Sequence, residues 1–198
     1  MFIDLEPTFH LRNYPLYDSS YDTLKITRIE SPIKLTTEDD DFTPRVAGYL
    51  RAYRFDLRFD HDQLLACADM LSHNLNNIAE YFLTEVGEVS TFLEEAVLSA
   101  DHILYVEEFY VDPQYRGKNI GIKSLALFFE AFGQGAIVAG CPFPAREYGP
   151  EKTSHLQMQL IRYWSKLGLV YYGAERNILW KENWQMPQWL QDCLWQEI

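Results

Sequence analysis

The segment Val111-Asp112-Pro113-Gln114-Tyr115-Arg116-Gly117-Lys118-Asn119-Ile120-Gly121 decides how this chain is interpreted. It follows an apolar, strand-like run over residues 103–111 and opens a helix-like run over residues 120–132. The first amides of a helix lack intrahelical acceptors, and the helix dipole places positive potential at that end. Arg116 and Lys118 add cationic donors, while Gly117 and Gly121 let the backbone approach a ligand closely. The segment therefore predicts a phosphate-binding turn between a strand and a helix; the alternative is a surface turn with two solvated cations.

This turn resembles the acyl-CoA-binding motif of the GNAT N-acetyltransferases, which reads Arg/Gln-x-x-Gly-x-Gly/Ala after a strand that ends Val-x-Pro. Here the six positions read Arg116-Gly117-Lys118-Asn119-Ile120-Gly121, so Asn119 stands where the first motif glycine is expected. Asparagine tolerates a positive φ and is a good helix N-cap. The resemblance implies that the amides of the loop and of the helix start hold the diphosphate of CoA.

A second segment, Tyr163-Trp164-Ser165-Lys166-Leu167-Gly168-Leu169, resembles the family's aromatic-Tyr-x-Lys-x-Gly-Phe stretch. In the family this stretch joins the last long helix to the strand after it. Hydrophobic periodicity over residues 103–181 predicts the order β-α-β-α-β-β. We therefore expect a single α/β domain over residues 1–198 with a GNAT-like fold, a mixed, splayed sheet with helices on both faces. Residues 1–20 are interpreted as a surface arm and residues 103–181 as the acyl-CoA-binding part.

The first hundred residues match the family poorly. We expect a strand over residues 21–29, a proline-containing loop over residues 30–44 and a long strand over residues 46–59. A single helix is predicted over residues 62–83, capped by Asp60 or Asp62, and a short helix over residues 91–99. Because this region forms much of the acceptor pocket in the family, the sequence does not identify the acceptor.

The resemblance implies that pantetheine pairs with the strand end Phe109-Tyr110-Val111 and that the Val111 amide stabilises the oxyanion. Glu107 and Glu108 are the candidate bases. In a regular strand they point to opposite faces, with Glu107 on the face of Phe109 and Val111. The alternative is a structural carboxylate paired to Arg51 or Arg54.

The family protonates the departing thiolate with a tyrosine in the last long helix. Trp164 aligns at that position and has no proton to give, although it can pack on pantetheine or in the core. Tyr163 is adjacent but about 100° further round a helix. The acid is therefore Tyr163, Tyr148 or water, or else the chain does not catalyse.

The net charge is −12, from 17 basic and 29 acidic side chains, and it disfavours binding to nucleic acid or an anionic membrane. An acidic surface of this kind favours the approach of a cationic acceptor such as an amine; the alternative is that the charge serves only to keep the protein in solution. Three widely spaced cysteines without a Cys-x-x-Cys pattern, and a start unlike a signal peptide, favour a reduced, cytoplasmic setting. Five scattered histidines show no metal-ligand spacing, so no metal is predicted.

These observations lead to one hypothesis and one alternative. The hypothesis is an N-acetyltransferase that uses acetyl-CoA as donor substrate and a primary amine as acceptor, by direct attack, with a homodimer as a possible assembly. The alternative is a non-catalytic acyl-CoA-binding or interaction module that keeps the fold.

Overall fold

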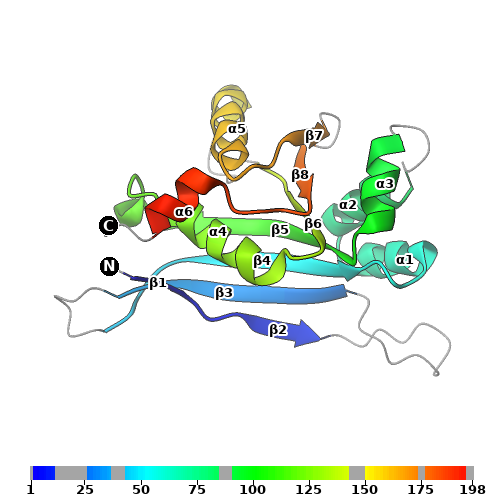
Figure 1. Cartoon of the computed structure of the whole chain (residues 1–198), viewed down its shortest axis with the longest axis horizontal. Helices are drawn as coiled ribbons and strands as arrows, with labels where there is room; N and C mark the ends of the chain where they lie inside the picture. Colours follow the sequence, from blue (N-terminus) through cyan, green and yellow to red (C-terminus); the bar gives the residue numbers. More distant parts are fainter. Residues whose placement is uncertain are drawn as a thin grey trace.

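The computed structural model describes residues 2–11, 26–36, 43–84, 91–142, 150–173 and 177–194. Within these residues the strands form an eight-stranded mixed sheet in the order β1-β3-β4-β5-β6-β8-β7, with β2 pairing to β3 beside β1. The β5–β6 pair is parallel and the other pairs are antiparallel. Figure 1 shows β3 to β5 running across the molecule, whereas β8 and β7 turn steeply upward.

The predicted N-terminal arm contributes two short strands, β1 (Phe2–Leu5) and β2 (Thr8–Leu11), which pair with β3 (Ile26–Thr36). The predicted loop over residues 30–44 is therefore wrong as far as residue 36. Pro32 can lie inside β3 because it has no pairing partner on the outer edge of that strand: β2 pairs with residues 27–30 and β1 with residues 33–36. The outer neighbour of β3 is interrupted at this proline, a position that a sheet tolerates.

The predicted helix over residues 62–83 is two helices, α1 (His61–Leu71) and α2 (His73–Leu83). They follow β4 (Arg45–Asp56), and α3 (Thr91–Ser99) comes next, as predicted. Ser72 divides the two helices with an extended backbone, and its hydroxyl accepts a hydrogen bond from the Leu75 amide at 3.2 Å. Asp60 caps α1 by accepting from the amides of Asp62 and Gln63. Serine favours the N-cap over the helix interior, which explains the break.

The order β-α-β-α-β-β predicted for residues 103–181 is confirmed. Its elements are β5 (His102–Val111), α4 (Ile120–Phe132), β6 (Ala136–Gly140), α5 (Pro150–Ser165), β7 (Tyr171–Gly173) and β8 (Ile178–Glu182). A short 3-10 helix, η2 (Pro113–Tyr115), lies in the turn before α4, and α6 (Gln188–Leu194) ends the described chain.

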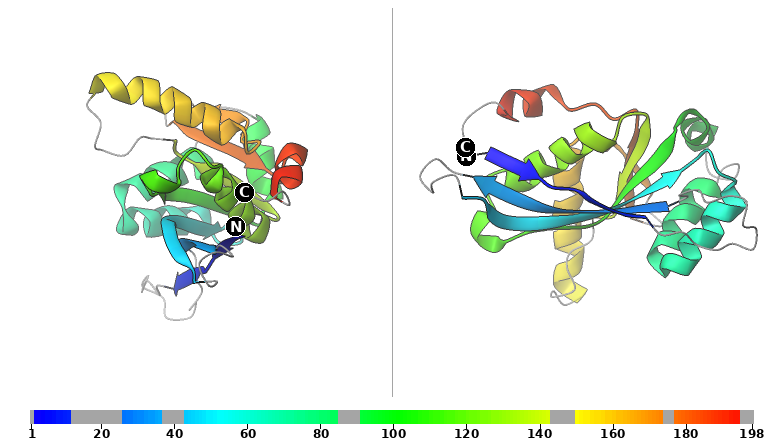
Figure 2. Two further views of the ribbon diagram at one scale, coloured as in Figure 1. Left: turned by 90° about the vertical axis from the view of Figure 1, so that its left-hand side faces the viewer. Right: turned by 90° about the horizontal axis from the view of Figure 1, so that it is seen from below.

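Helices cover both faces of the sheet, so the predicted mixed α/β class is confirmed. Helices α1 to α3 bury one face around Phe55, Phe82 and Trp180, and we call this the α1–α3 face. On the opposite face, the α4 face, α4 and α6 pack with the end of α5 around Phe129 and Trp164. Figure 2 shows α5 crossing the edge of the sheet and projecting beyond it.

The strands β5 and β6 separate halfway along β5. Their parallel pairing ends at Val106 and Gly140, but β5 continues to Val111. Over residues 107–111 the edge of β5 that would face β6 therefore has no neighbouring strand within the described parts of the chain. We call this opening the fork, and it is where the candidate site lies.

Candidate functional site

The strand β5 has a β-bulge at Glu107. Arg51 of β4 pairs with Glu108 and Ala52 pairs with Val106, so Glu107 is the extra residue. The bulge turns both glutamates to one side: Nη1 of Arg51 lies 3.7 Å from Oε2 of Glu107 and 3.0 Å from Oε2 of Glu108. The prediction that the two carboxylates point to opposite faces was therefore wrong, because it assumed an unbroken alternation.

The bulge also separates Glu107 from the face on which it was predicted to lie. Phe109 and Val111 pack beside Ile120 on the α4 face. Glu107 instead lies on the α1–α3 face, next to Arg51 and Tyr53. The end of β5 thus presents apolar side chains to α4 and carboxylates to the opposite side.

The two carboxylates have different environments. The side chain of Glu107 is 18% exposed, and burial raises its pKa, while Arg51 and the Tyr53 hydroxyl act in the other direction. Glu108 is 41% exposed and accepts a hydrogen bond from the Tyr49 hydroxyl at 2.7 Å, which raises the pKa of Tyr49 to about 12. Both carboxylates pair with Arg51, which was the structural alternative in the sequence. Glu107 nevertheless has the properties of a proton acceptor: a carboxylate that is largely buried and has a raised pKa.

Backbone groups of β5 point into the fork. The amide of Asp112 donates to the Ala47 carbonyl of β4 at 2.8 Å, and the Val111 carbonyl accepts from Nε of Arg116 at 2.8 Å. Because successive residues of a strand direct their amides to opposite edges, the Val111 amide points away from β4. The same alternation directs the backbone of Phe109 into the fork. Phe109 and Val111 are two of the three strand positions that the resemblance assigned to the donor, whereas the third, Tyr110, directs its carbonyl toward Gly48 of β4.

The predicted turn is a strand–turn–helix junction with amides available at the helix start. Gly117 has a φ of 80° and Asn119 a φ of 58°, and the Asn119 side chain makes no capping bond. The amides of Gly117, Lys118, Ile120 and Gly121 donate to no acceptor among the described residues. Positive-φ residues that direct consecutive amides outward form an anion-binding concavity.

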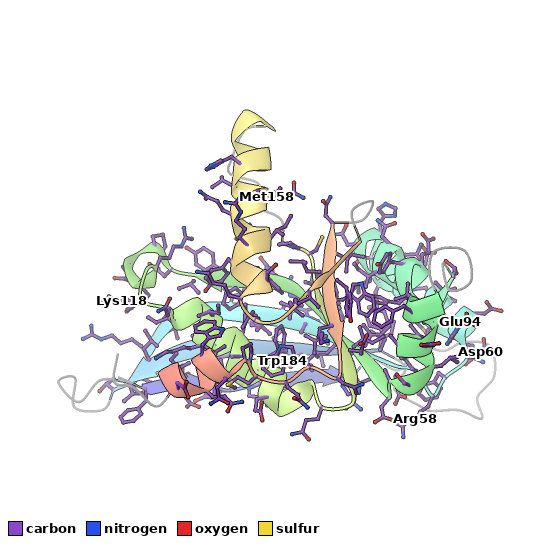
Figure 3. All side chains as sticks on the ribbon, turned by 45° about the horizontal axis from the view of Figure 1, so that its top comes forward. Arg58, Asp60, Glu94, Lys118, Met158 and Trp184 are labelled. Atoms are coloured by element: carbon purple, nitrogen blue, oxygen red, sulfur yellow. The ribbon has the colours of Figure 1, made fainter. Side chains whose placement is uncertain are left out.

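The two predicted phosphate-binding cations differ in their surroundings. Arg116 bonds to the Val111 carbonyl through Nε, and its guanidinium lies 5.6 Å from the centre of the Tyr110 ring. Lys118 is exposed, and Figure 3 shows it at the outer end of the turn. Lys118 is therefore free to reach a ligand, whereas Arg116 also secures the end of β5.

Tyr163 reaches from α5 to the start of α4. A Cβ atom placed on Gly121 would lie 2.7 Å from the Tyr163 hydroxyl and 3.2 Å from Cε1 of Phe109. Burial raises the pKa of Tyr163 to about 12, while the Ile122 amide, which faces the hydroxyl, opposes that rise. One amide of the helix start is thus occupied by the protein itself. The hydroxyl is protonated at neutral pH and lies beside a fork residue.

Trp164 belongs to the core. It is 5% exposed, and a Cβ atom on Gly140 would lie 2.1 Å from its ring. The ring therefore lies against the last residue of β6, at the point where the fork opens, and little of its surface is left for a ligand. Tyr148, the other candidate acid, lies outside the described residues.

Cysteine and metal chemistry have little support in the described residues. Burial raises the pKa of the Cys141 thiol, and this thiol donates to the Asn177 carbonyl at 3.3 Å, so it is a poor nucleophile. Within the described residues no group of three or more His, Cys, Asp or Glu side chains could hold a metal ion. None of the described helices is long and apolar enough to span a membrane.

Sequence reasoning missed a groove of about 580 Å³ on the α1–α3 face. Its lining comes from β2, β3, β4 and the end of β5: Thr8, His10, Glu30, Ser31, Pro32, Val46, Ala47, Gly48, Tyr49, Leu50, Tyr110 and Asp112. The groove was not predictable because β2 and most of β3 were interpreted as an arm and a loop.

Comparisons with known proteins add little to this geometry. No protein-family model and no curated protein matches the chain. Among solved structures, the chain is similar to the apo form of an agmatine N-acetyltransferase mutant, with a sequence identity of 15% and a TM-score of 0.34. The match covers 83% of this chain and 71% of that chain. A likeness at this level carries no argument about function, which must come from the site.

Proposed function

We propose that this protein is an N-acetyltransferase that transfers an acetyl group from acetyl-CoA to a primary amine. The observation that carries the proposal is the fork: a strand edge that leads directly into a helix start, where neither the edge nor the first amides have a backbone partner among the described residues. An extended pantetheine arm needs the first of these features and a diphosphate needs the second.

The donor would be held by backbone groups more than by side chains. The amides from Gly117 to Gly121 and the ammonium of Lys118 suit the diphosphate. The backbone of Phe109 and Val111 suits the amide groups of pantetheine, as an added strand. Pro113 ends this edge because it has no amide to give.

When bound, the donor would supply a thioester next to the bulge. The Val111 amide, which points into the fork, would then donate to the carbonyl oxygen as negative charge develops on it. Glu107 would accept a proton from the ammonium of the acceptor, directly or through water, and the neutral amine so formed would attack the thioester carbonyl. The raised pKa of Glu107 makes it a better base than an ordinary carboxylate. The hydroxyl of Tyr163 is the described group best placed to return a proton to the thiolate.

A second candidate is an acyl-CoA-binding module without turnover. Trp164 favours it, because the position that aligns with the family's acid is occupied by a buried indole. The contact of the Tyr163 hydroxyl with the Ile122 amide also favours the binding module, because this hydroxyl already has a partner within the protein. Binding alone does not separate this candidate from the enzyme.

Two measurements on wild-type protein test the proposal. Acetyl-CoA should raise the melting temperature, and free CoA thiol should appear when primary amines are added. Lys118→Ala should weaken acetyl-CoA binding about tenfold, because it removes a charge-assisted contact to phosphate. Arg58→Ala is the charge-matched control: Figure 3 shows Arg58 at the opposite end of the molecule.

Each outcome has a distinct meaning. The absence of any thermal shift contradicts the proposal. A shift without thiol release on any amine supports the binding module. If turnover occurs, Glu107→Gln should lower kcat and remove the rise of kcat/KM with pH that ionisation of Glu107 produces. Unchanged pH profiles would exclude Glu107 as the base.

A further inference from the structure

The groove on the α1–α3 face is continuous with the bulge. Tyr49 lines the groove and donates to Glu108, and Glu30 lines it and accepts from Nε of Arg51 at 3.0 Å. Arg51 in turn contacts Glu107 and Glu108. A molecule in the groove therefore lies next to the carboxylates of the fork, on the face opposite the α4 helix start.

The charged groups along this surface nearly cancel. Glu30, Glu107, Glu108 and Asp112 provide four carboxylates, and the three guanidinium groups of Arg28, Arg51 and Arg116 lie among them. With His10 neutral, one negative charge is in excess. That excess lies at the bulge, because Arg51 is shared by three carboxylates.

The far end of the groove does not favour a second cation. Asp112 already accepts from the Gln114 amide, and the guanidinium of Arg116 lies over the neighbouring Tyr110 ring. Glu30, on the opposite wall, contacts Arg28, Arg51 and His10. A diamine or polyamine would bring its second charge next to Glu30, which already pairs with two guanidinium groups, or next to the guanidinium of Arg116.

The rest of the groove is apolar and aromatic. Tyr49 and Tyr110 are stacked at 5.4 Å with an interplanar angle of 26°, and they are 41% and 37% exposed. Arg116 lies on the Tyr110 ring, and Pro32 pairs with Tyr49 from β3. The edges and open parts of these rings, together with Pro32 and Val46, form a surface for a flat, apolar body.

From these features we infer that the acceptor is a primary monoamine with an aromatic body, held in the groove beside Tyr49 with its amine at Glu107 and Glu108. This inference rests on the proposed function for the reaction. It concerns a binding surface that can be tested without the donor.

The test uses 2-phenylethylamine, with 1,4-diaminobutane as the dicationic probe and ethylamine as the probe without a ring. Calorimetry on the full chain without acetyl-CoA should show 2-phenylethylamine binding about tenfold more tightly than either of the other amines. Tyr49→Ala should remove this preference. Tyr49→Phe should retain it, because the ring remains and only the hydroxyl contact to Glu108 is lost.

Preferred binding of 1,4-diaminobutane, or equal weakening of all three amines by Tyr49→Ala, would overturn the inference. So would the absence of 2-phenylethylamine binding to folded wild-type protein. If 2-phenylethylamine binds with the expected preference while acetyl-CoA gives neither a thermal shift nor turnover, the groove inference holds and the proposed transferase function fails. If turnover occurs, Tyr49→Ala should raise the KM for 2-phenylethylamine and leave its kcat within about threefold.

Discussion

The position of the Tyr163 hydroxyl at the start of α4 can be tested by a double-mutant cycle with Gly121. An alanine at 121 would place its Cβ 2.7 Å from this hydroxyl, well inside normal contact distance. Crowding of this kind costs about 1–3 kcal/mol. Alanine is better than glycine in a helix by about 1 kcal/mol. We therefore expect Gly121→Ala alone to be neutral or to destabilise by up to about 2 kcal/mol.

In a Tyr163→Phe background the crowded oxygen is absent. Tyr163→Phe itself should cost about 0.5–1.5 kcal/mol, because the Ile122 amide loses its acceptor. Adding Gly121→Ala to it should then be neutral or stabilising, apart from the contact at 3.2 Å to the Phe109 ring. The coupling energy between the two substitutions should be about 1–3 kcal/mol in favour of the double mutant.

Equilibrium urea unfolding of the four proteins, followed by tryptophan fluorescence, measures this coupling. Gly117→Ala is the matched control: nothing lies within 4 Å of its Cβ position, but its φ of 80° makes alanine unfavourable. Its cost should therefore be the same with tyrosine or phenylalanine at 163. If Gly121→Ala costs the same in both backgrounds as well, the hydroxyl does not lie at the helix start and our account of Tyr163 is refuted.

Substitutions at three further positions test the fold. Gly140→Ala should lower the free energy of unfolding in urea by about 1–3 kcal/mol, because the Cβ of the new alanine would overlap the Trp164 ring. An unchanged stability would show that the ring does not lie against residue 140. Ser72→Ala should lower the free energy of unfolding by about 1 kcal/mol, whereas Ser72→Gly should lower it by only a few tenths of a kcal/mol. The same urea assay resolves this difference, and equal losses would show that Ser72 does not cap α2. Burial lowers the pKa of His102 below 6.5, so the unfolded chain takes up its proton first as the pH falls, and stability is lost from about pH 6.5 downward. Unfolding at a series of pH values should show a smaller loss below pH 6.5 for His102→Gln, and an unchanged pH dependence would contradict this assignment.

The C-terminal half of the fold was predictable because its signals are local. Residues 111–121 carry a proline, two glycines and an asparagine at the positions where the backbone turns, and the structure has the predicted strand, turn and helix there. The N-terminal half was not, because Pro32 signals a loop to any local reading. Only the pairing of β1 and β2 on either side of it shows why a strand can pass through that residue.

The candidate site divides in the same way. The helix start and its glycines follow from sequence spacing, whereas the sides taken by Glu108, Phe109 and Val111 relative to Glu107 depend on a bulge that pairing with β4 creates. Hydrophobic alternation assigns faces only while the strand is regular. The groove could not be predicted at all, because its walls come from four strands brought together by the sheet.

The bulge also explains how two separate features come to lie at one place. The sheet keeps the available amides of α4 on one face and the charged groove on the other, so a donor and an acceptor bound there could meet only through an opening in the sheet. A β-bulge increases the local twist of its strand and disrupts the ladder. In β5 this happens at Glu107, and the pairing with β6 ends one residue earlier, at Val106. Glu107 keeps the alternation of Ile103 and Tyr105, so the irregularity at which the strands separate is the one that turns Glu108 to the same side and sends Phe109 and Val111 to the α4 face. A regular β5 would be expected to lose this arrangement of the two carboxylates.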